Sequence, residues 1–144
     1  AQWPDADAVL AFILFDIDDF KQINDTYGHA NGDLALKTVA DLCRQSWRQQ
    51  DVVARVGGEE FAVLCHAASR DQALAMAERM RAYLARARVS GENGAIFTLT
   101  ASFGVACAYR GHGGAAGALF RRADELLYRA KLAGKNRVVS GDID

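Results

Sequence analysis

The feature that most constrains the fold is a continuous apolar run, Ala8 to Phe15, which ends in an acidic segment. The run shows no helical period, so it predicts a central β-strand covered on both faces. It is far shorter than the roughly 20 residues that a membrane-spanning helix needs. No basic segment precedes it, and Asp16, Asp18 and Asp19 follow it in place of a small-residue cleavage site, which argues against a secretory signal. We therefore expect a cytoplasmic domain.

The composition is that of one globular domain with a sizeable core. Of the 144 residues, 51% are hydrophobic and 24% are charged, which excludes collagen-like and disordered chains. No repeat or linker divides the sequence, so we expect residues 1–144 to form a single domain. The three cysteines, Cys43, Cys65 and Cys107, are odd in number and lie among apolar neighbours. They are therefore expected in the core rather than in disulfides or a zinc site.

Charge is distributed unevenly along the chain. The formal net charge of −1 argues against a general binder of nucleic acid or of an anionic membrane surface. Residues 1–33 hold seven acidic residues and one lysine, whereas residues 34–144 hold eleven acidic and sixteen basic residues. The carboxylates are thus concentrated near the N-terminus, where a metal ion could bind.

Two helices are expected after the first strand. A first helical stretch runs to about Tyr27, and the turn-forming residues 28–33 lead into a second helix. In the second helix an apolar stripe recurs at helical spacing and should pack on the sheet. This stripe comprises Leu36, Val39, Cys43 and Trp47.

A hairpin and a third helix follow. Val52–Val56 and Phe61–Cys65 are apolar segments separated by Gly57-Gly58, which predicts a type I′ turn whose central residues need positive φ. Ser69 and Gln72 have the spacing of a capping box at the start of a helix. The apolar face of this helix comprises Ala73, Met76, Ala77, Met80 and Leu84.

The rest of the chain predicts a strand, a helix and a short final strand. The strand covers residues 97–108, and a glycine-rich loop at 111–117 leads to a helix that is stopped by Gly134. The inward face of this helix comprises Leu119, Ala123, Leu126, Leu127 and Ala130. Residues 137–140 form the final strand. The element order matches a βαββαβ plan with additional helix and hairpin elements, an α+β sandwich.

Two acidic pairs are candidates for binding a cation. Asp16 and Asp18 are two positions apart at the end of the buried strand, so their carboxylates point to the same side if the strand continues. Glu59 and Glu60 directly follow the glycine turn, and alternation allows at most one of them into the same site. Carboxylate oxygens suit Mg²⁺, which commonly binds one or two carboxylates plus substrate phosphates. Solvated turns also carry acids, so neither pair alone establishes a metal site.

Several residues could bind phosphate or a base. The residues Ile17–Phe20 begin a helix, where free N–H groups hold phosphate oxygens, and Lys21 adds a charge. Lys131 and Lys135 lie at the end of the last helix, where they either bind phosphate or complement the helix dipole. Asn24 and Asp33 offer an amide and a carboxylate that match the donor edge of guanine. Turn stabilisation and N-capping are the alternative for those two residues.

Four segments, in order, resemble the GGDEF domain of diguanylate cyclases, and the resemblance covers nearly the whole chain from Ala8 onward. The segments are Phe15-Asp16-Ile17-Asp18-Asp19-Phe20-Lys21-Gln22-Ile23-Asn24-Asp25, Tyr27-Gly28-His29-Ala30-Asn31-Gly32-Asp33, Arg55-Val56-Gly57-Gly58-Glu59-Glu60-Phe61 and Ala130-Lys131-Leu132-Ala133-Gly134-Lys135-Asn136. The form Gly-Gly-Glu-Glu-Phe is one of the two associated with active members.

The resemblance implies a ferredoxin-like palm fold, as in nucleotide cyclases, and condensation of two GTP into cyclic di-GMP with release of two pyrophosphates. It implies that Asp16, the Ile17 carbonyl and Glu59 bind Mg²⁺ or Mn²⁺, and that Glu59 also helps to deprotonate the attacking 3′-hydroxyl. In a two-metal arrangement the ions lower the pKa of the hydroxyl and neutralise the leaving pyrophosphate. Lys21 would stabilise charge on the phosphates.

The resemblance also implies a substrate site. In it, Asn24 and Asp33 select guanine, His29 lines the nucleotide site, Phe20 belongs to the helix start that faces the phosphates, and Lys131 with Lys135 holds them. Each domain binds one GTP, so a homodimer is needed for catalysis, and appended sensor domains usually drive its formation. Such domains could also anchor a full-length protein to a membrane.

A further resemblance concerns regulation. Arg48-Gln49-Gln50-Asp51 fits the Arg-x-x-Asp inhibitory motif of the family, which binds cyclic di-GMP, and Arg79 lies where a supporting arginine is expected. A plain helix-end role is the alternative. The six residues from Asp51 to Gly57 span about 20 Å when extended, so product bound there would inhibit allosterically.

The sequence departs from the family in two places. Members normally carry an Asp-x-Leu-Thr-Gly-Leu-x-Asn-Arg segment before the first strand, and residues 1–7 contain nothing like it, so we expect the chain to lack the usual N-terminal segment. Position 135 is Lys where Arg is frequent, which keeps the charge but loses bidentate geometry.

Two other functions remain open from the sequence. The first is a catalytically silent cyclic di-GMP receptor that signals through Arg48, Asp51 and Arg79. The second is a cyclase or polymerase for another nucleotide, built on the same palm geometry. The acids and lysines of the metal and phosphate motifs favour the diguanylate cyclase over a pure receptor.

Overall fold

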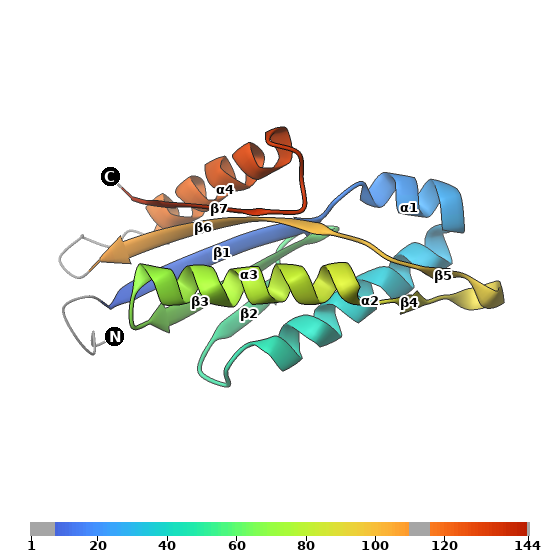
Figure 1. Ribbon diagram of the computed structural model, residues 1–144, viewed down its shortest axis with the longest axis horizontal. Coiled ribbons are helices and arrows are strands. Elements are labelled where there is room, and N and C mark those ends of the chain that lie inside the picture. The colour runs from blue at the N-terminus through green and yellow to red at the C-terminus, as the bar shows by residue number, and fades with distance from the viewer. Residues whose placement is uncertain (1–7, 110–115, 144) are drawn as a thin grey trace.

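The computed structural model describes residues 8–109 and 116–143. Its elements are β1 (Val9–Ile17), α1 (Phe20–Tyr27), α2 (His29–Ser46), β2 (Val52–Arg55), β3 (Glu60–Ala67), α3 (Arg70–Arg86), β4 (Val89–Ser90), the 3₁₀-helix η1 (Glu92–Gly94), β5 (Ile96–Phe97), β6 (Ala101–Tyr109), α4 (Ala116–Leu132) and β7 (Val138–Asp142) (Figure 1). The expectations for residues 1–7, and most of the predicted glycine-rich loop, lie outside the described residues.

A five-stranded sheet in the order β2-β3-β1-β6-β7 forms the centre of the fold. β1 is antiparallel to both β3 and β6, whereas β7 is parallel to β6. Alternate residues of β1 join two cores: Val9, Ala11 and Ile13 pack with α2 and α3, and Leu14 packs with α4. The α+β class and the central, doubly covered first strand are therefore confirmed (Figure 1).

The helix α4 lies very close to the sheet where β6 carries a glycine. A Cβ on Gly104 would lie 2.2 Å from the carbonyl oxygen of Ala123 and 2.5 Å from the backbone nitrogen of Leu127. The five inward residues predicted for α4 are all buried. This contact fixes the helix over β1 and β6, so its last turn, with Lys131, is held above the C-terminal end of β1.

Two other local predictions are confirmed. The Ser69 hydroxyl caps α3 by accepting from the backbone N–H of Gln72 at 3.1 Å, and the Gln72 side chain accepts from the N–H of Ala68 at 2.6 Å. The three cysteines are buried, and burial raises the pKa of Cys43 and Cys65 to about 11. They remain neutral thiols within the core.

The hairpin turn and the start of the second helix were predicted wrongly. Gly57 and Gly58 do not have positive φ, so the turn is not type I′. The hairpin instead has a four-residue loop, Val56 to Glu59, in which the N–H groups of Val56 and Gly57 both point to the Glu60 carbonyl, at 2.9 and 3.3 Å. α2 begins at His29, directly after Gly28. Gly28 has φ 91, and this single residue is enough to end α1 and redirect the chain into α2.

The predicted strand at 97–108 is divided in two. β5 pairs with β4 in a separate hairpin, which is attached to the α1–α2 corner: the Asn31 side chain accepts from the N–H of Glu92 at 2.7 Å, and Tyr27 stacks on Phe97 with ring centroids 4.3 Å apart. β6 begins only at Ala101. The residues between them approach β1, where the Thr100 carbonyl accepts from the N–H of Asp18 at 2.8 Å.

The helices within residues 8–109 and 116–143 include none that is long and apolar enough to cross a membrane.

Candidate active site

Asp16 lies at the C-terminal end of β1, between Glu60 of β3 and Ser102 of β6 in the strand register. The residue is only 6% exposed. Its Oδ2 accepts from the Lys131 Nζ at 2.5 Å, while its Oδ1 is buried and has no hydrogen-bond partner among the described residues. A buried carboxylate oxygen without a partner is costly, so this side chain is suited to a bound cation.

The β2–β3 hairpin brings two more acids to Asp16. The backbone N–H of Ile17 donates to the carbonyl of Glu59 at 3.2 Å, which joins the hairpin loop to the end of β1. The Arg55 guanidinium holds the loop by donating to the carbonyl of Gly58 at 2.6 and 3.0 Å. The loop that carries Glu59 is thus fixed from both sides.

Burial and neighbouring carboxylates raise the pKa of Asp16 and of Glu60. Burial raises the pKa of Asp16, the Lys131 ammonium opposes this rise, and the charges of Asp18 and Glu59 add to it. Burial also raises the pKa of Glu60, with Asp16 and then Asp124 contributing. Glu60 is the strand partner of Asp16, whereas Glu59 lies in the loop before β3, so the alternation expected along a strand does not apply to this pair of glutamates.

The donors present fit a magnesium ion that is completed by substrate. Within the described part of the chain, no group of three or more His, Cys, Asp or Glu side chains could hold a metal by itself. Mg²⁺ does not need one, because it commonly binds one or two carboxylates together with substrate phosphates and water. The unpartnered oxygen of Asp16, the nearby Glu59 and the adjacent Ile17 carbonyl meet that requirement.

Asp18 differs from Asp16 although the sequence presents the two alike. β1 ends at Ile17, so Asp18 lies in a turn. Its carboxylate accepts from the hydroxyls of Thr100 and Ser102 at 2.7 and 2.6 Å, and from the backbone N–H of Asn136 at 3.0 Å. Sequence reasoning did not identify these three donors, because no local pattern links residues more than 80 positions apart.

The lysines reach the same end of the sheet from two directions. Lys131 comes from α4, and Lys135, in the turn after it, pairs through its Nζ with Asp19 Oδ1 at 2.5 Å. This bond raises the pKa of Lys135. Lys21 is exposed in the first turn of α1, which begins with the partly buried Phe20. Of the predicted phosphate-binding residues, Lys131 and Lys135 are thus paired with carboxylates at this end of β1.

The proposed base-selecting residues meet where α1 packs on α2. A Cβ on Gly32 would lie 1.8 Å from the Oδ1 of Asn24, so the Asn24 amide fills the space that this glycine leaves open. Asp33, the next residue, is exposed, as is His29 at the start of α2. Asp33 lies inside α2 and is therefore not an N-cap, which removes its structural alternative.

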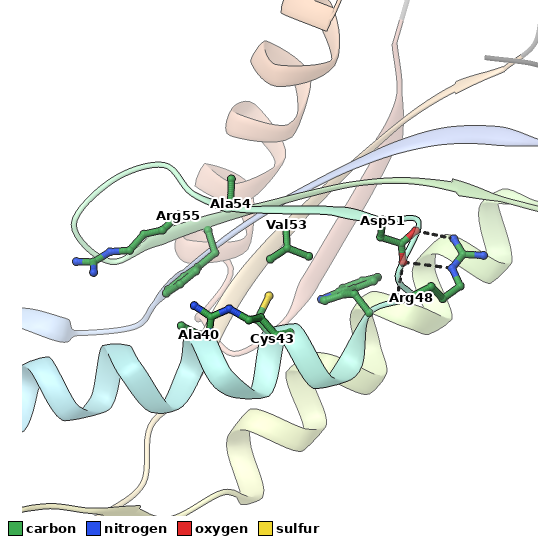
Figure 2. A pocket seen from close by; sticks show the side chains of 10 residues that line it. Ala40, Cys43, Arg48, Asp51, Val53, Ala54 and Arg55 are labelled. Carbon is green, nitrogen blue, oxygen red and sulfur yellow. Dashed lines mark hydrogen bonds and ion pairs between the residues drawn. The ribbon is translucent and has the colours of Figure 1, made fainter.

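Arg48 and Asp51 lie at the opposite end of β2, beside a pocket of about 320 Å³ between α2 and β2 (Figure 2). Asp51 Oδ1 accepts from Arg48 Nη2 at 3.0 Å and its Oδ2 accepts from Arg48 Nε at 3.2 Å; Arg48 also donates to the His66 carbonyl. The Asp51 side chain has no exposed surface. A second cavity of about 560 Å³, lined by Arg48, Arg79 and residues of α2 and α3, lies next to this pair.

Comparison with known proteins identifies the family of this chain. Residues 2–137 match the profile described as "Diguanylate cyclase, GGDEF domain". The chain belongs to the GGDEF family. This GGDEF domain is 41% identical over 129 residues to "Diguanylate cyclase A" of Treponema denticola and 43% identical over 129 residues to "Diguanylate cyclase DgcP" of Pseudomonas aeruginosa. Each match covers 90% of the domain, but only 34% and 19% of those relatives, so the domain spans about a third of their length or less.

Solved structures of GGDEF domains share the fold. The GGDEF domain of DgcB from Caulobacter crescentus, solved in complex with c-di-GMP, aligns with a TM-score of 0.85 at 30% identity, over 92% of this chain and 78% of that one. The "active GGEEF domain of a diguanylate cyclase from Vibrio cholerae" aligns with a TM-score of 0.81 at 32% identity, over 92% and 82%. The present domain carries the same five letters at Gly57–Phe61.

Proposed function

We propose that this GGDEF domain is a diguanylate cyclase, which condenses two GTP into cyclic di-GMP and releases two pyrophosphates in the cytoplasm. The observation that carries the proposal is the buried, unpartnered oxygen of Asp16 beside the Glu59 loop and Lys131. This combination unites a cation site with a phosphate site at one end of the sheet. The string Gly57–Phe61, which is also that of an active relative, supports it.

In the proposed mechanism, Asp16, Glu59 and the Ile17 carbonyl would hold Mg²⁺ or Mn²⁺. The bound ions would lower the pKa of the attacking 3′-hydroxyl and neutralise the leaving pyrophosphate. Glu59 accepts the proton of this hydroxyl. With a cation bound there, Asp16 would no longer need the Lys131 ammonium, and this side chain, which is 39% exposed, would be available to bind the phosphates.

The remaining substrate contacts come from α1, α2 and the turn after α4. The N–H groups at Phe20 and the Lys21 ammonium face the phosphates, as does Lys135, while Asn24 and Asp33 select guanine beside His29. Each domain offers one such triphosphate site, whereas the reaction joins two nucleotides. We therefore propose that a homodimer places two domains face to face, and that other domains of a longer protein control its formation.

Turnover measured across protein concentration tests the proposal. Since two domains must meet, the rate of cyclic di-GMP formation per domain is expected to rise with concentration while the domain is mainly monomeric. Glu59→Gln removes a ligand charge without changing volume, and is expected to lower the rate about 10³-fold. Chromatographic detection of cyclic di-GMP is the measurement. Absence of product from a forced dimer with GTP and Mg²⁺ would overturn the proposal.

We further propose that cyclic di-GMP inhibits the domain at the cavity beside Arg48. Arg79 lines this cavity and, like Arg86 and Tyr83 in the same wall, comes from α3. Guanidinium groups suit phosphate diesters and guanine, and the buried Asp51 contributes by orienting Arg48. The catalytically silent receptor remains the alternative for this site, and GGDEF structures solved with c-di-GMP are compatible with either role.

Arg79→Ala is expected to raise the inhibition constant of cyclic di-GMP at least about tenfold while leaving the initial rate unchanged, because it removes one charged contact. Arg79 is a better position for this test than Arg48, because removal of Arg48 would leave the buried Asp51 carboxylate without its ion-pair partner. The exposed Arg88, which does not line the cavity, provides the matched control Arg88→Ala. Unchanged inhibition in Arg79→Ala would exclude this site. Product binding by calorimetry without any turnover would select the receptor.

A further inference from the structure

Asp18 has no part in the reaction proposed above, although it lies two residues from Asp16 and is only 7% exposed. Its Oδ1 accepts from the Ser102 hydroxyl at 2.6 Å, and its Oδ2 accepts from the Thr100 hydroxyl at 2.7 Å and from the Asn136 N–H at 3.0 Å. Both oxygens are thus occupied by donors from other parts of the chain, unlike the free oxygen of Asp16.

The third donor belongs to a turn with an unusual backbone. Gly134, Lys135 and Asn136, which connect α4 to β7, have φ values of 126, 66 and 48. Residues with a Cβ adopt this region uncommonly, asparagine more often than lysine, and three contacts hold the turn in place. Those contacts are the bond to Asp18, a bond from the Lys135 N–H to the Ala130 carbonyl at 3.0 Å, and a bond from Arg81 to the Asn136 side chain at 2.8 Å.

The opposite turn, between β1 and α1, is left-handed as well. Asp19 has φ 54, and its carboxylate pairs with Lys135 at 2.5 Å. Asp18 and Asp19 thus bond to Asn136 and Lys135, and we call these two contacts the turn clamp. One turn leads into the helix start proposed to face the phosphates, and the other follows Lys131 and carries Lys135. The turn clamp sets the spacing between the two halves of the phosphate site.

We infer that Asp18 is a positioning residue, which fixes the α4–β7 turn against the end of β1 so that Lys131 and Lys135 face the triphosphate. The inference rests on the proposed function. The competing role is that of a metal ligand, which the closeness of Asp18 to Asp16 would suggest. The three donors on its carboxylate favour positioning, because a ligand would have to give up at least one of these bonds.

Two substitutions at position 18 separate the roles. Asp18→Asn keeps an oxygen in the place of Oδ2 for the Asn136 N–H and the Thr100 hydroxyl, and the Ser102 hydroxyl can rotate to accept from the new amide. If Asp18 is a positioning residue, Asp18→Asn is expected to keep a turnover rate within about threefold of wild type. Asp18→Ala is expected to raise the KM for GTP about tenfold or more, with a much smaller change in kcat. A metal ligand predicts a large loss in both variants, with a higher Mg²⁺ concentration for half-maximal rate. That result would overturn the inference.

Ser102→Ala is the matched control. It removes one bond from the same carboxylate but leaves the Asn136 contact, so it is expected to lower stability without changing the KM for GTP. If Ser102→Ala and Asp18→Ala changed the KM for GTP equally, the turn clamp would not be the cause of the change.

A second readout needs no nucleotide chemistry. In Asp18→Ala the Asn136 amide loses its acceptor, and its hydrogen exchange measured by NMR is expected to accelerate, whereas that of β1 amides is expected to stay slow. GTP affinity should fall while guanosine affinity stays unchanged. Unaltered exchange at Asn136 would refute the turn clamp even in an active enzyme. A wild-type domain that makes no product would refute the proposed function instead, with the exchange result still readable.

Discussion

Replacing Asp16 by Asn is expected to lower cyclic di-GMP formation by roughly 10³-fold, equivalent to about 4 kcal/mol of transition-state stabilisation, and yet to stabilise the folded domain in metal-free buffer at neutral pH. The loss of activity follows because an amide does not replace a charged ligand. The gain in stability follows from the raised pKa of Asp16, since folding then disfavours the ionised carboxylate. The partner Lys131 is partly exposed, so water solvates its ammonium after the change.

The direction of the pKa shift determines how the stability difference between Asp16→Asn and wild type changes with pH. A carboxyl whose pKa is higher in the folded state stabilises the fold below its ordinary value of 3.8, where it is protonated in both states, and loses that contribution as the pH rises through the folded value. The neutral amide introduced by Asp16→Asn does not titrate. The difference in thermal midpoint between variant and wild type is therefore expected to vanish in acid and to grow toward neutral pH.

Calorimetric melts with and without Mg²⁺ measure both effects. Mg²⁺ is expected to raise the midpoint of the wild type and not that of Asp16→Asn, because a ligand stabilises only the form that binds it. The exposed Asp41, which pairs with Arg44 at 3.0 Å, supplies the control Asp41→Asn, with a change within about 0.5 kcal/mol. An Asp16→Asn domain less stable than wild type at pH 7 would show that the bond to Lys131 outweighs the cost of burial.

The sequence predicts those parts of the fold whose cause is local. The apolar run at β1 and the helical spacing of Leu119, Ala123 and Leu126 each identify an element and its buried face, because one side of the element must face the core. The Gly57-Gly58 signal was correct for a hairpin but wrong for its turn. Two adjacent glycines are compatible with several loop conformations. The loop observed is one in which two backbone N–H groups donate to the Glu60 carbonyl.

The candidate site could be predicted only in part, because some of its features depend on contacts between distant parts of the chain. The motifs identified Asp16, Glu59, Lys131 and Lys135 as residues of one site, and the structure brings them to one end of the sheet. The difference between Asp16 and Asp18 was not predictable, since it depends on which donors β6 and the α4–β7 turn deliver. The same holds for Asp51, whose burial beneath Arg48 follows from the packing of α2 on β2 rather than from its spacing in the sequence.

The domain is expected to prefer GTP to ATP by roughly 10⁴-fold in kcat/KM. Guanine presents an N1–H and a 2-amino group, which the Asp33 carboxylate and the Asn24 Oδ1 can accept, whereas adenine has an acceptor at N1 and no 2-amino group. A site built to pair with a donor rejects the analogue that lacks it, because its own acceptors are then left unpaired. Competition by ATP at concentrations near those of GTP would favour the cyclase for another nucleotide.

Gly32→Ala tests the arrangement of the two acceptors without removing either. The new methyl would lie 1.8 Å from the Asn24 Oδ1, so the Asn24 amide must turn away, while alanine inside α2 favours the helix by about 1 kcal/mol over glycine. The variant is expected to fold at least as stably as wild type and to lose about tenfold or more of its preference for GTP over ATP. Asp33→Ala should lose more, since it removes a charged acceptor. Steady-state rates with each nucleotide give the ratio, and an unchanged ratio in both variants would place guanine selection on other residues.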